Sequence, residues 1–562
     1  MPSERKIEQE ILGSGGVEDD PDEFDRNFWA NKVIRDGGVI NLLSLLAKAI
    51  PPMANATTDP KTWGYKDVAR LPEFEQKEWQ DACLRELEAL ERRNIFELVD
   101  RPKGRKVIKN QWVFDQKSDR RKRARLVAKG FSQVEGLDYD QIFSPVVRFK
   151  TVRLILAMAA LHDWHITGLD VRNTFLYGKL DEEIYMEQLE GFHVPGRLDA
   201  VFRLIKALYG LKQAGLTWWR TLRESMIELG FKNLVSDAGL YIFQDECGFV
   251  IAVIYVDDTI FCRLNKTLVQ ELKNKFMQRW EVRDLGDVTE FLCMHIIKIG
   301  RMINIDQCDY LNTVLQRCRM ESTKSATTPL LAGYMPEPAA PDATIDPELQ
   351  SRYQTVIGSL LYLTLGTRPD ITFAVTKLAQ YAARPTKEHL QKALNICRYL
   401  VGTKNYCITY NSFSGQGLMA CTDSDWASDP FNRKSQSGYF LKLAGGAISW
   451  TSRAQKTIAL SSTEAEYMVL SDCCRQVVWM HTLLGELSYN LKPIPIYRRR
   501  FFHLQPSSRL ITLILTNDPS PASIPACPAV FCFAHNSQPL PHNLARPIVS
   551  RTVVHPCRLL LF

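Results

Sequence analysis

The sequence lacks the long apolar run that a helix needs to cross a membrane. Its longest apolar stretch near the amino terminus, residues 39–50, is interrupted by Asn41 and Lys48 and is too short for a bilayer. Residues 1–10 are charged and lack the apolar segment of a signal peptide. We therefore expect a protein that is neither membrane-bound nor secreted.

The sequence also lacks cysteine patterns that hold metals, because its 14 cysteines include no CxxC pair and no Cys/His series at ligand spacing. Without signs of secretion, these cysteines are expected to be reduced intracellular thiols. The net charge of +7 is small for 562 residues, so it hints at polyanion binding without establishing it. The length predicts two to four domains.

The pattern along the chain predicts five segments. The second begins with an amphipathic helix and then alternates short apolar runs with helical patterns, as in a mixed α/β or α+β domain. Within it, residues 107–108 and 112–114 are expected to be a strand pair. The segments are 1–70 with little pattern, 71–325, a linker and helices in 326–405, strands and a long helix in 406–497, and a tail in 498–562 that we expect to be disordered.

The sharpest local signal is FVIAVIYVDDTIFC, residues 249–262. Its apolar run is long enough for two buried strands and is broken by adjacent acids, Asp257 and Asp258. Two carboxylates there would be costly to desolvate unless they lie at a hairpin turn or bind cations. One interpretation is a turn whose aspartates only face water. The other is a hairpin, with Tyr255 first in its motif, that presents oxygen ligands to Mg²⁺.

Two-metal phosphoryl transfer requires a further carboxylate on the other side of the ion pair. Asp170 is the natural candidate, because it follows the strand-like residues 164–169 and precedes Val171. Its carboxylate would then lie at a strand end. The plain alternative is an ordinary helix N-cap or turn aspartate.

Several long blocks resemble the copia-type reverse transcriptase in order and spacing, over roughly residues 75–497. Their number gives a specificity that one tetrapeptide lacks. We therefore identify a resemblance to the Ty1/copia-type retrotransposon Pol polyprotein. The blocks are RARLVAKGFSQVEGLDYDQIFSPVV (123–147), LDVRNTFLYGKLDEEIYM (169–186), LIKALYGLKQA (204–214), YVDD (255–258), IGSLLYLTLGTRPDITFAV (357–375) and ISWTSRAQKTIALSSTEAEY (448–467).

The resemblance implies an α+β fold, with a right-hand polymerase of fingers, palm and thumb, then a helical connection and an incomplete ribonuclease H-like α/β domain. Asp170, Asp257 and Asp258 match the aspartates that hold two Mg²⁺ ions, for which Mn²⁺ is a substitute. Phe175 matches the ring beneath the incoming sugar, where it leaves no room for a 2′-hydroxyl. The remaining nucleotide- and template-binding positions are Arg123, Arg125, Lys129, Gly210, Lys212 and Tyr255.

The basic residues have a plain alternative, which is a solvated loop. Nucleic-acid contact is favoured because Trp112, Phe114 and Phe131 interleave rings on which bases can stack.

Four residues depart from the family pattern and lower the expected activity of this copy. Thr174 adds bulk beside the aromatic position. Gly215 and Leu216 replace a proline and an arginine. Cys293 stands where a glycine is typical near the primer-binding strand, so its side chain could crowd the backbone.

Two further motifs, CTDSDWASD and LSSTEAEYMVL, carry acids near the carboxyl-terminal side of the likeness. Asp423 is expected to end a strand. The resemblance makes Asp423 and Glu466 Mg²⁺ ligands of a ribonuclease H-like site, with Glu464 as an alternative. The plain interpretation is a helix cap, since Ser461 with Glu464, or Thr463 with Glu466, forms a capping box.

The ribonuclease H-like site is expected to lack a ligand and to be inactive. The family places another strand ending in an aspartate near residues 493–497, but here three arginines, 498–500, follow. A cationic run is the opposite of what a metal site needs. Asp518 is too distant to replace the missing acid.

The resemblance implies an RNA-directed DNA polymerase that uses deoxynucleoside triphosphates. The implied partners are an RNA template, a DNA primer, RNA–DNA hybrid and other proteins of the element. The implied location is intracellular, either cytoplasmic and particle-associated or nuclear. The alternative is a decayed relic that binds nucleic acid without catalysis, which the aberrant tail and the departures motivate.

Overall fold

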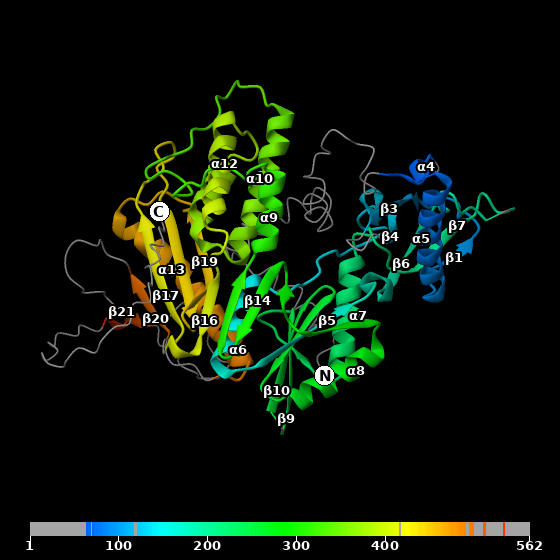
Figure 1. Cartoon of the computed structure of the whole chain (residues 1–562), viewed down its shortest axis with the longest axis horizontal. Coiled ribbons are helices and arrows are strands. Elements are labelled where there is room, and N and C mark those ends of the chain that lie inside the picture. Colours follow the sequence, from blue (N-terminus) through cyan, green and yellow to red (C-terminus); the bar gives the residue numbers. More distant parts are fainter. Residues whose placement is uncertain are drawn as a thin grey trace, which may run out of the picture. The chain divides into compact units, whose positions relative to one another are not determined.

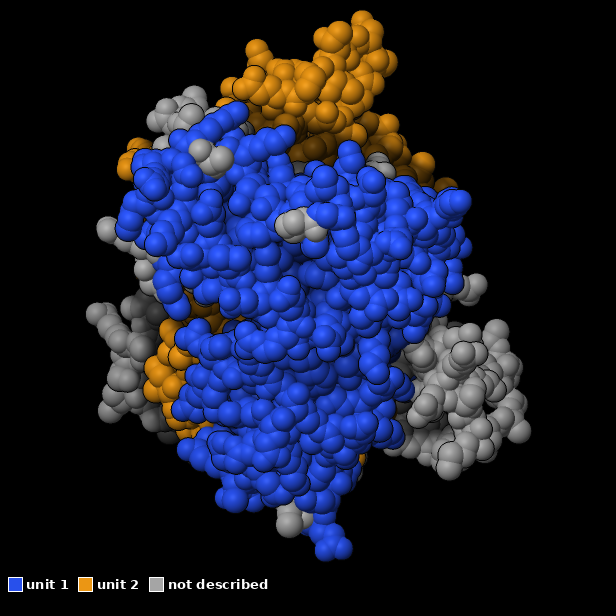
Figure 2. Space-filling view, turned by 90° about the vertical axis from the view of Figure 1, so that its right-hand side faces the viewer, with its two compact units in different colours: residues 1–148, 164–288 blue, residues 149–163, 289–562 orange. Residues whose placement is uncertain are grey.

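The computed structural model describes residues 63–68, 70–116, 121–194, 196–246, 248–414, 417–489, 494–498, 510–512 and 532–533. The chain divides into two compact units, residues 1–148 with 164–288 and residues 149–163 with 289–562 (Figure 2). Both contain helices and strands, in agreement with the predicted α+β class. No helix in these described stretches combines the length and hydropathy needed to cross a membrane.

The first unit begins with the amphipathic helix that the sequence predicts, α5 (Glu73–Arg92), which buries Trp79, Cys83 and Leu90. This face packs with the hairpin of β3 (Asn110–Gln116) and β4 (Lys122–Ala128), where Trp79 lies edge-on to Phe114 at 5.2 Å between ring centroids. A four-stranded sheet shares the same core. Its order is β1 (Phe96–Val99), β7 (Val201–Lys206), β6 (Lys179–Met186) and β2 (Val107–Ile108).

The predicted strand pair in this region is half right. Both segments are strands, but β2 pairs in parallel with β6 and β3 pairs with β4, so they do not pair with each other. Only Lys109 separates β2 from β3, which is too short a connection for a hairpin turn. Each strand therefore takes a partner from further along the chain.

The first unit also contains a six-stranded antiparallel sheet (Figure 1). Helices α7 (Ala214–Glu228) and α8 (Lys266–Arg279) share its core, in which Leu222, Phe261 and Phe276 are buried. The apolar runs of the central strands match this burial. The order is β12 (Val282–Asp287), β5 (His165–Val171), β11 (Asp258–Arg263), β10 (Gly248–Tyr255), β9 (Leu240–Asp245) and β8 (Lys232–Asn233).

The second unit includes helix α6 (Phe149–His162), which packs against β15 (Met302–Asp306), β16 (Ile408–Asn411) and β19 (Gly446–Ala454). Nearly every residue of α6 is buried, as expected of a helix that is apolar on most sides. A separate helical core is formed by α9 (Cys308–Arg317), α10 (Pro347–Gly366), α11 (Thr372–Ala379) and α12 (Lys387–Gly402). The adjoining sheet runs in the order β13 (Glu290–Phe291), β14 (Met294–Ile299), β15 (Met302–Asp306) and β16 (Ile408–Asn411).

The last sheet follows the strand-like pattern predicted after residue 407 and is accompanied by the long helix α13 (Ser462–Glu486). Most of the tail after residue 498 lies outside the described residues, so its predicted disorder remains a prediction; two of its segments are strands of this sheet. The order is β19 (Gly446–Ala454), β18 (Gln436–Leu443), β17 (Met419–Asp425), β20 (Pro495–Arg498), β21 (Leu510–Thr512) and β22 (Cys532–Phe533).

The compact units cut the chain at other points than the predicted domain boundaries. Residues 149–163 and 289–325 were expected within the polymerase segment, yet they pack with later residues. A unit defined by packing and a segment defined by family likeness are different divisions, so the domain boundaries remain a prediction. The predicted linker after residue 328 contains turns until α10 begins at Pro347.

Candidate active site

The segment 249–262 forms the predicted hairpin, with β10 and β11 paired from Ile251 opposite Cys262 to Tyr255 opposite Asp258. Val256 and Asp257 make the two-residue turn. On its other side, β11 pairs with β5, and Asp258 lies directly opposite Asp170. The hairpin therefore brings together the three aspartates that the sequence singled out.

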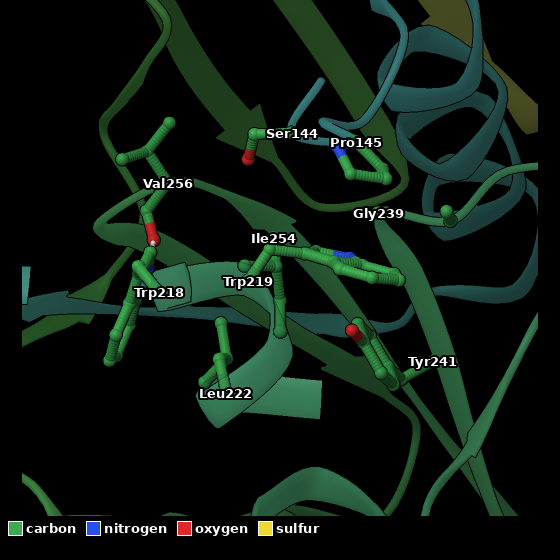
Figure 3. A pocket seen from close by; sticks show the side chains of 10 residues that line it. Ser144, Pro145, Trp218, Trp219, Leu222, Gly239, Tyr241, Ile254 and Val256 are labelled. Carbon is green, nitrogen blue, oxygen red and sulfur yellow. Dashed lines mark hydrogen bonds between the residues drawn. The ribbon is translucent and has the colours of Figure 1, made fainter. Parts of the chain in front are cut away.

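Two hydrogen bonds to its backbone carbonyls hold the hairpin turn in place. Val256 has a φ of 56°, which a β-branched residue adopts only where its surroundings hold it. The buried indole Nε1 of Trp218 donates to the Val256 carbonyl at 2.7 Å (Figure 3), and the Val171 amide donates to the Asp257 carbonyl at 2.9 Å. A small hollow beneath the turn is lined in part by Trp219 and Tyr241.

The surroundings of the turn disfavour the negative charge of the Asp257 carboxylate. The exposed Asp257 nevertheless has a raised pKa, first because nearby protein atoms desolvate its carboxyl and also because the Asp170 carboxylate repels its charge. Arg125 and Arg123 act in the opposite direction. Among the described residues, no three His, Cys, Asp or Glu side chains are grouped closely enough to hold a metal ion. The backbone thus places the carboxylates together, while their side chains are not gathered around one point.

Phe175 lies in the short 3₁₀ turn η4 (Thr174–Tyr177), which follows β5. It is partly buried, and its ring meets Tyr209 edge-on with centroids 5.7 Å apart. The departing residue Thr174 is buried, with 4% of its surface exposed, so its added bulk packs inside rather than toward solvent.

The basic strand β4 carries Arg123 and Arg125. The Arg125 guanidinium lies over the Tyr209 ring at 5.3 Å, a cation–π distance. Burial, and secondarily the charge of Arg125, lowers the pKa of Arg123. Lys129 follows the end of β4, and its amide donates to the Lys109 carbonyl.

The interpretation of the aromatic rings as stacking platforms is wrong for two of them. Trp112 and Phe114 are 3% and 0% exposed and belong to the core beneath α5. Phe131 is 78% exposed and stays available for stacking. Trp112 and Phe114 are two residues apart in β3, so strand alternation points both to the same side, which here is the buried one.

Gly210 has a packing role that the sequence did not indicate. Its φ is 93°, and a Cβ placed there would meet the Ala128 carbonyl oxygen at 2.1 Å. The neighbouring Lys212 donates from Nζ to the Tyr139 hydroxyl at 2.9 Å, so in this structure it contacts protein. Gly210 thus packs the loop before α7 against the end of β4, and Lys212 joins that loop to Tyr139.

The other departures differ in consequence. A Cβ on Gly215 would lie 3.1 Å from the Ser144 side chain, and Leu216 is buried against Trp219. Cys293 has a φ of 55°, the left-handed region in which glycine is unstrained. A glycine preference at that position therefore has a backbone reason.

Sequence reasoning missed three polar residues near the aspartates and a fourth, Glu86, near Arg125. Tyr209 and Asn173 are hydrogen-bonded to each other, and Arg283 on β12 is in register with Asp170. Glu86 on α5 has a raised pKa because of burial, despite the attraction of Arg125. Tyr209 and Asn173 lie inside the quoted motifs, so motif membership was the available signal. No sequence pattern marks Glu86 or Arg283.

At the second predicted site, Asp423 lies near the end of β17, as expected. Glu464 is used in a cap: its amide donates to the Ser461 hydroxyl at 3.1 Å, and its carboxylate accepts from the Leu460 amide at 2.6 Å. The cap interpretation therefore holds for Glu464. Glu466 also lies near the start of α13 and remains the predicted Mg²⁺ ligand on this helix.

A strand does follow α13, as the resemblance implies, and β20 pairs in parallel with β17. In this register Arg498 lies opposite Thr422, one residue before Asp423. The expected aspartate at this strand end is thus an arginine. Asp518 lies outside the described residues.

Comparison with known proteins gives consistent matches. Residues 93–332 match the family described as reverse transcriptase (RNA-dependent DNA polymerase). The chain is 38% identical over 443 residues to the retrovirus-related Pol polyprotein from transposon TNT 1-94 of Nicotiana tabacum, covering 77% of this chain and 33% of that protein. It is 30% identical over 313 residues to the putative transposon Ty5-1 protein YCL074W of Saccharomyces cerevisiae, covering 55% of this chain and 100% of that protein.

A solved structure is also similar, the foamy viral protease-reverse transcriptase dRH in complex with double-stranded DNA. The alignment has a TM-score of 0.42 and 11% identity and covers 75% of this chain and 62% of that one. The chain spans about a third of the length of the first curated relatives that it matches.

Proposed function

The chain belongs to the copia-type retrotransposon Pol polyproteins, and on this basis we propose that it is an RNA-directed DNA polymerase. It adds deoxynucleotides to a primer 3′-hydroxyl and releases pyrophosphate. The observation that carries the proposal is the register of β5 and β11, which sets Asp170 opposite Asp258 beside the Asp257 turn. The six-stranded sheet is then the palm, and α5 with the β3–β4 hairpin belongs to the fingers.

Asp170, Asp257 and Asp258 are the residues that would hold Mg²⁺, or Mn²⁺ in its place. The raised pKa of Asp257, due to desolvation and to Asp170, fits a site whose like charges a cation would relieve. When bound, the ions stabilise charge on the phosphates and favour attack by the 3′-hydroxyl. Trp218 and Val171 keep the turn in place through its carbonyl groups.

The other residues bind and orient the substrate. Arg123 and Arg125 offer guanidinium groups for charge-assisted hydrogen bonds to phosphate oxygens. Phe175 excludes a 2′-hydroxyl from the sugar position. The partners that follow are an RNA template, a DNA primer, their hybrid and deoxynucleoside triphosphates, in an intracellular setting.

The ribonuclease H-like part is proposed to be inactive. Asp423 and Glu466 supply acids, but the register of β20 puts Arg498 where the family would place a third acid. An arginine at that strand end has no oxygen with which to ligate a cation. A second candidate function is a non-catalytic nucleic-acid-binding relic, and the same arginine is the observation that favours it.

The test is Mg²⁺-dependent incorporation of dTTP by the full chain on a poly(rA)/oligo(dT) template. Loss of incorporation in the Asp257→Asn/Asp258→Asn variant, with activity retained in Asp245→Asn, supports the proposal. Asp245 is a matched control because it is an exposed acid on β9 of the same sheet. A folded wild-type chain that binds template and primer without incorporation would support the relic instead.

A further inference from the structure

Tyr209 has a backbone position fixed by close packing. Its carbonyl accepts a hydrogen bond from the Ala128 amide at 2.7 Å, at the end of the basic strand β4. The next residue, Gly210, leaves no room for a side chain against the Ala128 carbonyl. The Tyr209 ring is therefore placed by the strand that carries Arg125.

The same side chain makes two contacts with the turn that carries Phe175. Its ring meets the Phe175 ring edge-on, with centroids 5.7 Å apart and planes inclined at 76°. Its hydroxyl donates to Asn173 Oδ1 at 3.3 Å. Asn173 precedes the η4 turn and has a φ of 55°, so it sets the direction in which that turn leaves β5.

The chemistry of the hydroxyl suits a permanent hydrogen-bond donor. Burial is the main cause that raises the pKa of Tyr209 to about 12, with smaller effects of nearby charges including Asp257. The hydroxyl thus keeps its proton at any pH at which a polymerase would work. The guanidinium of Arg125 over the ring connects this contact to the group proposed for phosphate binding.

We infer that Tyr209 is a positioning residue that holds Phe175 at the sugar site and thereby sets discrimination between deoxyribonucleotides and ribonucleotides. The inference rests on the proposed function, because Phe175 acts on a sugar only if the chain binds nucleoside triphosphates. A gate of this kind works by overlap with a single hydroxyl, so its selectivity depends on how firmly the ring is held. Tyr209 holds it through both a ring contact and a hydrogen bond.

The experiment measures the dissociation constants of dTTP and UTP from the full chain bound to poly(rA) and a dideoxy-terminated oligo(dT) primer. Because the blocked primer cannot be extended, the ratio of the UTP and dTTP dissociation constants can be measured whether or not the chain is catalytically active. Tyr209→Phe should lower the preference for dTTP about fivefold, the factor that corresponds to one hydrogen bond of ordinary net strength. Binding of dTTP itself should change less than binding of UTP, which a general loss of structure would not produce.

The matched control is Tyr177→Phe, which removes a hydroxyl from the same η4 turn. The Tyr177 hydroxyl accepts from the Glu281 amide at 3.2 Å, and its ring meets Trp280 edge-on. This variant should keep the wild-type preference. Asn173→Gly, in which glycine accommodates the left-handed φ, should lower the preference as Tyr209→Phe does, and the two together should not add.

An unchanged preference in Tyr209→Phe, or an equal drop in Tyr177→Phe, would overturn the inference. Equal binding of dTTP and UTP by the wild-type chain would also overturn it, because no gate would then exist. The proposed function is judged separately, by incorporation on an unblocked primer.

Discussion

Asp170 and Asp258 lie directly opposite each other on the antiparallel strands β5 and β11, with Asp257 in the adjoining turn. Like charges in such a cross-strand pair destabilise a sheet. The arrangement therefore costs stability in the absence of a counter-ion, and a cation that binds there would recover it. If the proposed cation site is correct, the charges that bind the cation destabilise the metal-free fold, so function and stability are opposed there.

Replacing Asp257 tests this opposition. Asp257→Asn should lower dTTP incorporation more than about a hundredfold, since even outer partners of a metal site cost about 10–100-fold. In metal-free buffer its Tm should be equal to or above that of the wild type, because the variant removes a repelled carboxylate. Thermal unfolding with and without Mg²⁺ measures this. A clear drop in the metal-free Tm would show that the carboxylate stabilises the fold.

Trp218 supports the strained turn, and its hydrogen bond can be removed alone. Trp218→Phe leaves the Val256 carbonyl without its indole donor, which should lower the unfolding free energy by about 1–3 kcal/mol. Misplacement of the turn should reduce kcat by about tenfold to a hundredfold with little change in KM. The control is Trp219→Phe, whose ring nitrogen makes no hydrogen bond to the turn. Equal kcat values in the two variants would argue against a role in positioning.

Local patterns predicted the hairpin but not the neighbours of its aspartates. A long apolar run broken by two adjacent acids is best satisfied by two buried strands joined by a turn. The hairpin of residues 249–262 could therefore be predicted from the local sequence. The register of Asp170 with Asp258 joins residues far apart in the chain. Its strand-end position made Asp170 a candidate partner, and the family likeness supported it, but no local pattern gave the pairing itself. For Trp112 and Phe114 the local pattern was misleading, because an aromatic residue next to basic residues in the sequence can equally belong to the core.

The placement of α6 was also beyond local reasoning. Its sequence predicts a buried helix, but it does not indicate which part of the chain the helix packs against. The deciding contacts are made by Lys150, whose Nζ donates to Gln476 Oε1 at 2.8 Å, and by Arg153 with residues near 366 and 448. These partners lie two to three hundred residues further along the chain, where no sequence window reaches.

Replacing Gly210 adds two separate costs to the fold, one for its left-handed backbone and one for close packing against Ala128. Gly210→Ala should cost about 1–2 kcal/mol for the left-handed φ and a further 1–3 kcal/mol for overlap with Ala128. Gly136→Ala is the matched control, with a φ of 77° and nothing within 4 Å of the added Cβ, so it should show only the first cost. Chemical denaturation of both variants gives the comparison. Equal losses would mean that the contact between Gly210 and Ala128 relaxes freely.

His295 gives the second unit a pH-dependent contact. Its Nδ1 lies 3.1 Å from Asp306 Oδ1 and its Nε2 lies 3.0 Å from Asp309 Oδ2. Burial lowers the pKa of His295, but the two carboxylates outweigh it and leave the pKa raised. The imidazolium should therefore add stability below its ordinary pKa of about 6.5, and this should be lost as pH rises through the raised folded value.

The measurement for His295 is the Tm of wild type and His295→Gln at acidic and alkaline pH. The variant should lose roughly 0.5–1 kcal/mol at about pH 5.5, as for partly exposed pairs, and less at about pH 8.5. The exposed His193→Gln serves as the control. A larger loss at the alkaline pH would reverse the sign and contradict the ion pairs.

Arg153 tests whether α6 depends on the carboxyl-terminal sheet. This arginine is 3% exposed, lies over the Trp450 ring at 3.9 Å and donates to the carbonyls of Ile448 and Gly366 at 2.9 and 2.7 Å. Arg153→Met should lower the unfolding free energy by at least about 2 kcal/mol, since each buried carbonyl left without a donor costs roughly 1–3 kcal/mol. Arg384→Met is the control, because Arg384 also donates to carbonyls but is exposed.

The same contacts predict the behaviour of a shortened chain. Ending the protein at residue 405 removes both Ile448 and Trp450 while leaving Arg153 in α6 with the Gly366 carbonyl. A guanidinium that loses part of its partners in a largely apolar setting is more costly than its replacement by methionine. The shortened chain should therefore have a lower Tm than the full-length protein, and adding Arg153→Met to it should recover part of the loss. Tm values of the four proteins form a double cycle. If the Tm changes of the substitution and the shortening simply add, α6 does not depend on the later sheet. The polymerase segment would then be stable without the later residues, as the domain boundaries from sequence predict.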